Sequence, residues 1–257
     1  MPALRILALS EDGAHDAHSV LVALAKPMLR LVVPGVDTRR ERLQFDEASA
    51  DARRATRANL WRSSNEGDEP YVRALKRAIV AQLLIDDDEG RPAGFVFFHY
   101  DGDEPFFLAD KSDARRHWQV FRSGIAQQLR AFRPDADELS IERILGRLIE
   151  IEPFYCIEAW TYQHTEVAKV ICQRGCGKHQ AEFDSWASDR GRLDEIARPW
   201  SPRQLSGCLH KGHNLALAGP GYPAEEVWRA GKSYYCTVDR MSECADLVEA
   251  LKRTWGP

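Results

Sequence analysis

The chain has 257 residues, of which 44% are hydrophobic and 29% are charged. This size allows one sizeable core, or one α/β domain with an appended lobe, and the composition is typical of a soluble protein. The formal net charge of −4 argues against a protein whose main task is to coat nucleic acid. No apolar run approaches the roughly 20 residues that span a bilayer, and the N-terminal sequence turns acidic too early for a secretory signal. We therefore expect a cytoplasmic protein without a membrane partner, whose six cysteines are thiols or metal ligands.

The first part of the chain begins with a short apolar run over residues 3–10, which predicts a buried strand. Residues 19–32 predict a helix that Pro27 could interrupt. Residues 29–35 could hold a second strand. Residues 37–70 are rich in charge and in Ser, Asn and Gly, so we expect a surface insertion that contains one helix.

The middle of the chain continues this alternation. Its expected elements are a helix over 69–90, a strand over 93–100, a helix over 112–132, a strand over 147–157 and a helix over 158–173. The strands are apolar runs, and the helices carry apolar residues at helical spacing. Alternating strands and helices predict an α/β fold with a mostly parallel sheet that is covered by helices on both faces.

The pattern changes beyond Gly175. The segment 175–235 holds many Gly, Pro, His and Trp residues and shows little periodicity. Residues 239–255 then predict a final helix with basic residues at its end. We expect a core over residues 1–175 and a C-terminal extension over residues 176–257 that packs on it.

Acidic residues directly follow two of the expected strands. Glu11, Asp12 and Asp16 follow the first strand, and Asp101, Asp103 and Glu104 follow the strand at 93–100. In an open parallel sheet, ligands bind at the carboxyl ends of the strands. Carboxylates two positions apart in extended chain point the same way, so Asp101 and Asp103 can reach one ion. Oxygen ligands favour Mg²⁺ or Mn²⁺, and such an ion can polarise a phosphoryl oxygen and orient a displacement.

Each of these acids could also have a purely structural role. Asp-Gly is a common turn dipeptide, and Asp101 begins such a pair. Asp16 and Glu158 lie near expected helix starts, where the helix dipole alone favours an acid. Basic residues that could hold phosphate near the acids form a wider set: Lys111, Arg115, Arg116, Lys211 and Lys232.

The order of these motifs resembles the TOPRIM domain of topoisomerases, primases and OLD-family nucleases. The matching stretches are LRILALSEDG, which contains Glu11, and FVFFHYDGD, which contains Asp101 and Asp103. The stretch IEIEPFYCIEAW, which contains Glu158, is similar to an Ile-Glu-Ala-Trp element of small stand-alone TOPRIM-like proteins from bacterial defence loci. The resemblance covers roughly residues 3–175 and implies a TOPRIM-like, Rossmann-like core.

The resemblance implies a Mg²⁺-dependent nuclease, or one that uses Mn²⁺, which hydrolyses DNA or RNA in anti-phage defence. It implies that Asp101 and Asp103 bind the metal, that Glu11 is a metal ligand or a general acid/base, and that Glu158 is a further site acid. The 90 positions between Glu11 and Asp101 require an insertion, which we place at 37–70.

Possible partners also follow from the resemblance. Defence nucleases of this kind are often paired with an ATPase that senses infection. The chain has no Walker-type GxxxxGK[ST] motif, so such an ATPase would be a separate protein. A homo-oligomer is equally compatible with the sequence.

Two other functions are compatible with the same residues. One is a Mg²⁺-dependent phosphatase that uses Asp101 as its nucleophile and forms an aspartyl-phosphate. The other is a non-catalytic TOPRIM-like module that binds a partner and whose acid cluster is degenerate.

A second group of candidate ligands lies in the stretches CQRGCGKH and CLHKGH. It consists of Cys172, Cys176, His179, Cys208, His210 and His213. A structural Zn²⁺ takes four Cys or His ligands, although Cys-x₃-Cys is a less typical spacing than Cys-x₂-Cys. A free thiol on the apolar face of a helix is the alternative for Cys172.

Overall fold

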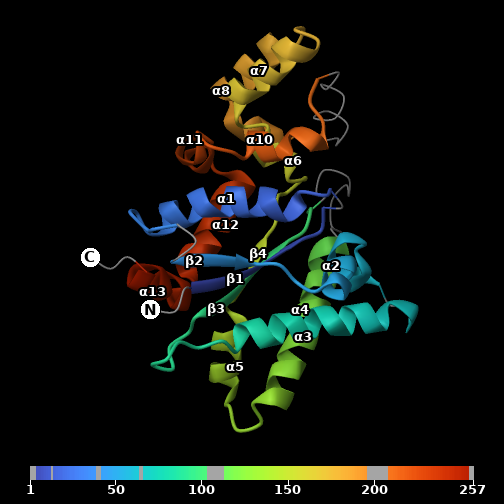
Figure 1. Ribbon diagram of the computed structural model, residues 1–257, viewed down its shortest axis with the longest axis vertical. Helices are drawn as coiled ribbons and strands as arrows, with labels where there is room; N and C mark the ends of the chain where they lie inside the picture. Colours follow the sequence, from blue (N-terminus) through green and yellow to red (C-terminus); the bar gives the residue numbers. More distant parts are fainter. Residues whose placement is uncertain are drawn as a thin grey trace.

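The computed structural model describes residues 4–12, 14–38, 42–63, 66–102, 113–195 and 208–254. In this part of the chain, four parallel strands form one sheet in the order β2-β1-β3-β4. The strands are β1 (Leu4–Ser10), β2 (Leu43–Asp46), β3 (Gly94–His99) and β4 (Leu148–Ile151). Helices cover the sheet on both sides (Figure 1), which confirms the predicted α/β architecture with a parallel sheet.

The central strand β3 is buried along its whole length. Its sequence GFVFFH is a continuous apolar run, which is typical of a parallel strand covered on both faces. Because β1 and β3 pair in parallel with Ser10 opposite His99, both strands end at the same edge of the sheet. The backbone N–H of Glu11 donates to the carbonyl of His99 at 3.0 Å, so the chain leaves β1 directly beside the end of β3.

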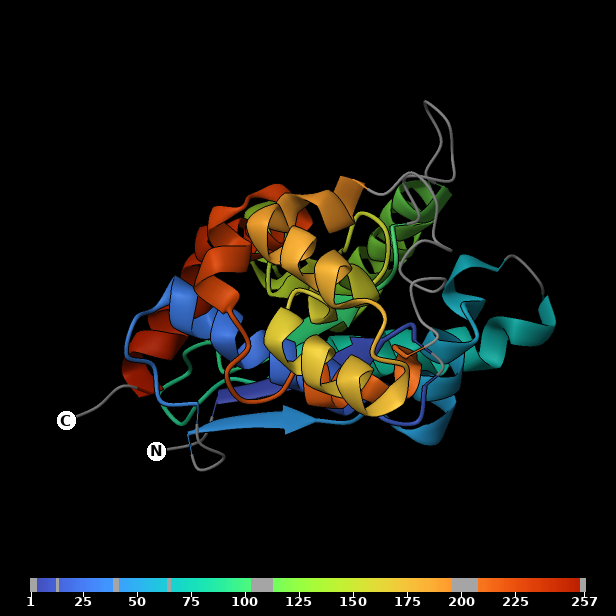
Figure 2. The same ribbon diagram turned by 90° about the horizontal axis from the view of Figure 1, so that it is seen from above.

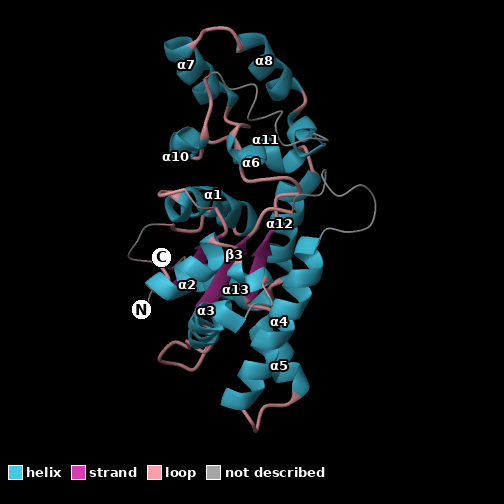
Figure 3. Cartoon of the chain, turned by 90° about the vertical axis from the view of Figure 1, so that its right-hand side faces the viewer, coloured by secondary structure: helices cyan, strands magenta, loops and turns pink. Residues whose placement is uncertain are grey.

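The two faces of the sheet bury separate apolar clusters. On one face, Ile6 and Phe97 contribute to a cluster with helices α1 (Ala17–Val32), α12 (Lys232–Glu243) and α13 (Ala245–Thr254). On the other face, Leu9 and Phe98 contribute to a cluster with α2 (Ala50–Arg57), α3 (Glu69–Leu83), α4 (Asp113–Phe132) and α5 (Glu138–Leu145). Figure 3 shows the strands between α1 and α12 on one side and α3 and α4 on the other.

Short helices follow β4 and extend the molecule beyond α1. They are α6 (Glu158–Thr161), α7 (Thr165–Gly175), α8 (Gln180–Ser188), α10 (Asn214–Leu217) and α11 (Ala224–Arg229), with 3-10 turns η4 (Arg190–Glu195) and η5 (Lys211–His213). The helices α7 and α8 lie at the end of the molecule farthest from the sheet (Figures 1 and 3). Their buried residues Cys172 and Phe183 belong to the same apolar cluster as Ile6 and Phe97. These short helices after β4 therefore share a continuous apolar core with the sheet.

The expected strand at 29–35 is wrong. Helix α1 continues to Val32 and passes through Pro27, with Met28 and Leu29 fully buried on its inner face. The burial of this apolar face outweighs the single backbone hydrogen bond that a proline removes.

The region 37–70 is more than a surface insertion. It supplies the edge strand β2, helix α2 and two 3-10 turns, η1 (Leu60–Arg62) and η2 (Glu66–Asp68), and Trp61 is buried. Strand β2 has only four residues, of which Leu43 alone is buried, so its apolar pattern is too short to predict a strand.

The long helices expected in the second half are divided. Residues 158–173 form α6 and α7 with a break at 162–164, and residues 239–255 contain the end of α12 and all of α13, with a break at Cys244. The irregular segment 175–235 contains helices too short to produce a clear period. Seen from above, both ends of the described chain lie on one side of the molecule (Figure 2).

Candidate functional site

Four acidic side chains gather at the carboxyl ends of the strands. Glu11 and Asp12 directly follow β1, Asp101 lies two residues beyond β3, and Glu158 begins α6 after β4. The structure thus brings together Glu11, Asp101 and Glu158, the predicted site acids that it describes, with Asp12, which follows the same strand as Glu11. Asp103 and Glu104 lie outside the described residues, so their predicted roles stay predictions.

Arg62 joins Glu11 and Asp101. Its Nη2 donates to Oε1 and Oε2 of Glu11 at 2.9 and 2.7 Å, and to the backbone carbonyl of Asp101 at 3.2 Å. The guanidinium lies over the indole of Trp61, with 4.8 Å from Cζ to the ring centroid. Because Trp61 is buried among aromatic side chains, the turn η1 holds Arg62 in the site.

The Glu11 carboxyl is only 8% exposed. Burial raises the pKa of Glu11 to about 7, the nearby Arg62 charge opposes this rise, and the Asp101 carboxylate adds to it. A carboxyl group with such a pKa can accept or release a proton near neutral pH.

Lys211 joins Asp12 and Glu158. Its Nζ lies 2.8 Å from Oδ1 of Asp12 and 3.9 Å from Oε1 of Glu158. Asn214 donates from Nδ2 to the same Glu158 oxygen at 3.3 Å. Burial opposes the charged form of Asp12, but the hydrogen bond and charge of Lys211 outweigh it and lower the pKa of Asp12.

Asp101 is held between the sheet and the start of α6. Its Oδ1 accepts the backbone N–H of Ile157 at 3.1 Å and lies 3.3 Å from Nε2 of His99. Nδ1 of His99 pairs with Oγ of Ser10 at 2.9 Å across the β1–β3 pair. Nε2 of His99 is fully buried, and it makes no hydrogen bond to any residue that the structure describes.

The donor set fits a hard divalent cation in its chemistry. Within the described residues, four carboxylates lie near two cationic side chains, Arg62 and Lys211, which leaves two formal negative charges in excess when these groups are all ionised. Only one guanidinium nitrogen contacts Glu11, so lone pairs of that carboxylate remain for an ion. Among the described residues, however, these acids do not form a group of three ligand atoms as close together as a metal site requires.

A small pocket opens beside this site at the ends of β1 and β2. It is lined in part by Ser10, His18, Arg53 and Arg57. Arg53 pairs with Glu47, while Arg57 is exposed. Basic side chains beside a carboxylate site are the groups that position a phosphate backbone.

Sequence reasoning missed Arg62 and Asn214. It placed Asp12 among the acids that follow the first strand but assigned it no role in the site. Arg62 lies 51 positions from its partner, and only its place after the single tryptophan of the region 37–70 sets it apart in the sequence. Of the predicted basic candidates, Lys211 reaches the site. Arg115 instead pairs with Glu152 at 3.0 Å.

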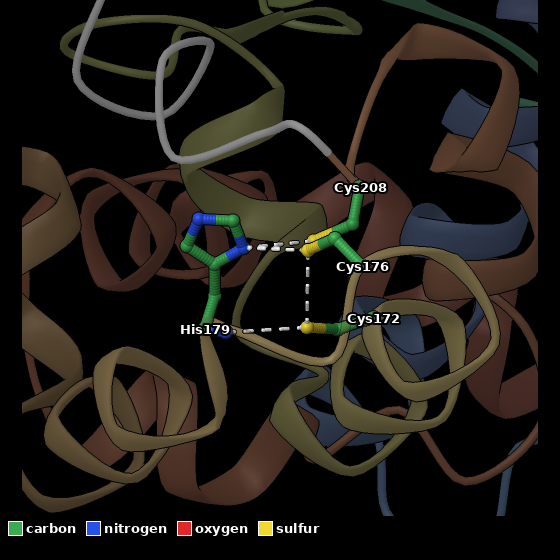
Figure 4. Close-up of side chains that lie close together, drawn as sticks. All are labelled: Cys172, Cys176, His179 and Cys208. Carbon is green, nitrogen blue, oxygen red and sulfur yellow. Dashed lines mark hydrogen bonds between the residues drawn. The ribbon is translucent and has the colours of Figure 1, made fainter.

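The structure also gathers four of the six predicted Cys and His ligands. The ligand atoms of Cys172, Cys176, His179 and Cys208 all lie within 4.8 Å of one another (Figure 4). His210 and His213 are not in this group. Their rings pack on each other with centroids 3.8 Å apart.

Among the described helices, none has the length and hydropathy that crossing a bilayer requires. Comparison of the chain with protein-family models, with curated proteins and with solved structures found no match in any of the three.

Proposed function

We propose that this protein is a phosphodiesterase with a TOPRIM-like core, which uses Mg²⁺ or Mn²⁺ to cleave nucleic acid. One observation carries the proposal: among the described residues, four carboxylates from three strand ends converge, and two cationic side chains pair with them. Burying unbalanced carboxylates destabilises a fold, so such a cluster is retained where a bound cation completes it. The resemblance of LRILALSEDG and FVFFHYDGD to TOPRIM motifs supports the same function.

The proposed roles follow from the contacts. Asp101, with Glu11 as a second ligand, would hold the divalent ion, which would polarise the phosphoryl group as a Lewis acid when bound. The role of Asp103 as a further ligand rests on the resemblance alone, because Asp103 lies outside the described residues. The alternative role of Glu11 is that of general acid/base, because burial raises the pKa of its metal-free carboxyl to about 7. Arg62 and Lys211 stabilise the negative charge that develops on the phosphoryl oxygens.

The biological role rests on the sequence resemblance alone. We propose a cytoplasmic anti-phage effector that acts with a separate ATPase sensor. The described residues contain no contact that identifies such a partner.

The ion pairs also support a second candidate, a non-catalytic partner-binding module. Arg62 and Lys211 already pair with Glu11 and Asp12, as expected of a cluster that no longer binds metal. A phosphatase with Asp101 as nucleophile is the third candidate. It differs from the nuclease in forming a covalent aspartyl-phosphate.

A cleavage assay on single-stranded DNA, double-stranded DNA and RNA separates these candidates. With Mg²⁺ or Mn²⁺, the wild type should cleave at least one substrate, and Asp101→Asn should lower the rate by about 100-fold or more. The matched control is Asp88→Asn, which changes an exposed acid in the turn that precedes β3, whereas Asp101 follows the carboxyl end of that strand. This variant should keep full activity. Equal activity of Asp101→Asn and wild type would contradict the proposal. Trapping of the wild type by beryllium fluoride would identify the phosphatase.

A further inference from the structure

The cysteine and histidine cluster is built by the ends of two helices. Cys172 lies in the last turn of α7, and Cys176 follows it by four positions, so both side chains lie on one face. Gly177 then reverses the chain with φ +67°, a left-handed conformation that glycine adopts without strain, and its N–H donates to the Cys172 carbonyl at 2.7 Å. His179 precedes the first residue of α8, and the distant Cys208 completes the group.

The distances within the cluster match a tetrahedral site. For Zn–S bonds of about 2.3 Å and a Zn–N bond of about 2.0 Å, tetrahedral geometry puts sulfurs about 3.8 Å apart and each sulfur about 3.5 Å from the nitrogen. The sulfurs of Cys172 and Cys176 are 3.9 Å apart. Nδ1 of His179 lies 3.1 Å from the Cys176 sulfur and 3.3 Å from the Cys208 sulfur. Figure 4 shows the three sulfurs and this ring nitrogen turned toward one another.

A disulfide or a set of ordinary hydrogen bonds fits this arrangement less well than a bound ion. A disulfide requires two sulfurs at about 2.05 Å, and all three of these cysteines are free. An isolated imidazole nitrogen has one lone pair or one proton, yet the Nδ1 of His179 faces two sulfurs at once. A single ion between the four atoms gives each of them a partner. The backbone N–H of His179 also donates to the Cys172 sulfur at 3.4 Å, a contact that supports a thiolate ligand from outside the coordination sphere.

We propose that Cys172, Cys176, His179 and Cys208 bind one structural Zn²⁺. Three thiolates and one imidazole are soft and borderline ligands, which select Zn²⁺ over Mg²⁺ or Mn²⁺. All four tetrahedral positions are filled by the protein, which leaves none for substrate and marks the site as structural.

The ion has a defined task in this fold. It ties α7 and α8, which lie far from the sheet, to Cys208. Three positions after Cys208, Lys211 contacts Asp12, and Asn214 contacts Glu158. Zn²⁺ therefore fixes the beginning of the segment that delivers two polar side chains to the carboxylate site. This inference does not depend on the proposed nuclease activity, because it rests on separate ligands.

Metal analysis of the purified 257-residue chain tests the inference. We expect about one Zn²⁺ per chain in the wild type and less than about a tenth of that in Cys208→Ser. The matched control is Cys236→Ser, a partly buried cysteine of α12 outside the cluster, which should keep its zinc. Wild-type protein that contains no zinc after purification and binds none when Zn²⁺ is added would overturn the inference. So would an equal loss of zinc in the two variants.

A second measurement uses the wild type alone, in case Cys208→Ser does not fold. Zinc X-ray absorption should give three sulfurs at about 2.3 Å and one nitrogen at about 2.0 Å. Replacement by Co²⁺ should give the visible absorption of a tetrahedral thiolate site. A shell of oxygen and nitrogen ligands alone would overturn the inference. Neither readout involves nucleic acid, so failure of the cleavage assay leaves this test unaffected.

Discussion

The burial of a single residue, Glu11, should make the stability of the fold depend on pH. Its pKa is about 7 in the folded protein, compared with 4.5 in the absence of the fold. Between these values, the folded protein keeps a proton that the unfolded chain has released. Raising the pH through this window therefore removes stability, by about 3 kcal/mol for a shift of this size.

The variant Glu11→Gln tests this effect because glutamine does not titrate. Wild-type stability should fall by about 3 kcal/mol more than that of Glu11→Gln between about pH 4 and about pH 8. Urea unfolding at both pH values, without divalent cations, measures the difference. An equal fall in the two proteins would show that the Glu11 pKa is not raised.

Lys211 is expected to stabilise the fold by neutralising Asp12. The Asp12 side chain is 2% exposed and Lys211 is 47% exposed, so Lys211→Met should cost only about 1–2 kcal/mol at neutral pH. Lys252→Met, which changes an exposed lysine at the end of α13, should stay within about 0.5 kcal/mol of wild type.

The pH dependence of this loss identifies its cause. Because Lys211 lowers the pKa of Asp12, the stability it supplies is present above the usual pKa of an aspartate and is lost as the pH falls through the lowered one. The cost of Lys211→Met should therefore shrink in acid, and Asp12→Asn should remove most of it. A cost that is unchanged in the double variant would contradict the ion pair.

Sequence analysis could name acids of this site and one basic residue, Lys211, but it could not tell which groups pair with one another. Glu11 and Asp101 follow apolar strands, and the topology of parallel sheets puts strand ends together. Arg62 and Lys211 reach the acids from 51 and 199 positions away. No local period or spacing encodes such contacts, because they depend on how a turn packs against the finished sheet.

At the scale of elements, the short turn η1 owes its position to one aromatic side chain. Trp61 is buried and packs against Phe98 and Phe121, with ring centroids 5.4 and 5.7 Å apart. Trp61→Ala should destabilise the protein by about 3–5 kcal/mol, and Trp61→Phe by clearly less, because it refills part of the volume. Chemical denaturation measures both.

Phe132→Ala is the control for this prediction. Phe132 is 62% exposed at the end of α4, so its removal should change stability by less than about 0.5 kcal/mol. Similar losses in Trp61→Ala and Phe132→Ala would show that the aromatic cluster does not hold the turn.

The elements that sequence reasoning predicted share one property, a long or continuous apolar pattern. Strand β3 and helix α4 are of this kind, and the structure confirms both close to their predicted bounds. Strand β2 was missed because its four residues carry one buried side chain. The division of the final helix at Cys244 was missed because the apolar period continues across the break. Tertiary contacts, and not the local sequence pattern, determine where β2 forms and where the final helix is divided.

Across the whole molecule, the last helices complete the core. Asp246, in the first turn of α13, pairs with Arg143 at 2.7 Å and with Arg147 at 2.9 Å. Asp246→Asn removes the shorter of two ion pairs of the buried Arg147, which then keeps only the pair to Asp86 at 3.5 Å. This loss should cost about 2–3 kcal/mol. One apolar cluster contains residues from both the sheet and the C-terminal helices. The whole protein should therefore unfold in one transition, at a lower denaturant concentration in Asp246→Asn than in the wild type.

Asp239→Asn is the matched control, because Asp239 is exposed on α12. Circular dichroism and tryptophan fluorescence should report coincident transitions in all three proteins. Two transitions in the wild type would contradict a shared core and would support an independent C-terminal unit.

The central claim is that the carboxylate cluster binds a divalent cation, and thermal unfolding with Mn²⁺ or Mg²⁺ tests it most directly. At a concentration ten times the Kd, a bound ion should add about 1.4 kcal/mol, or a rise in Tm of a few degrees. The rise should persist in Asp88→Asn and in Cys236→Ser, and it should disappear in Asp101→Asn. No rise in the wild type, or an equal rise in Asp101→Asn, would contradict the claim and would favour the non-catalytic module.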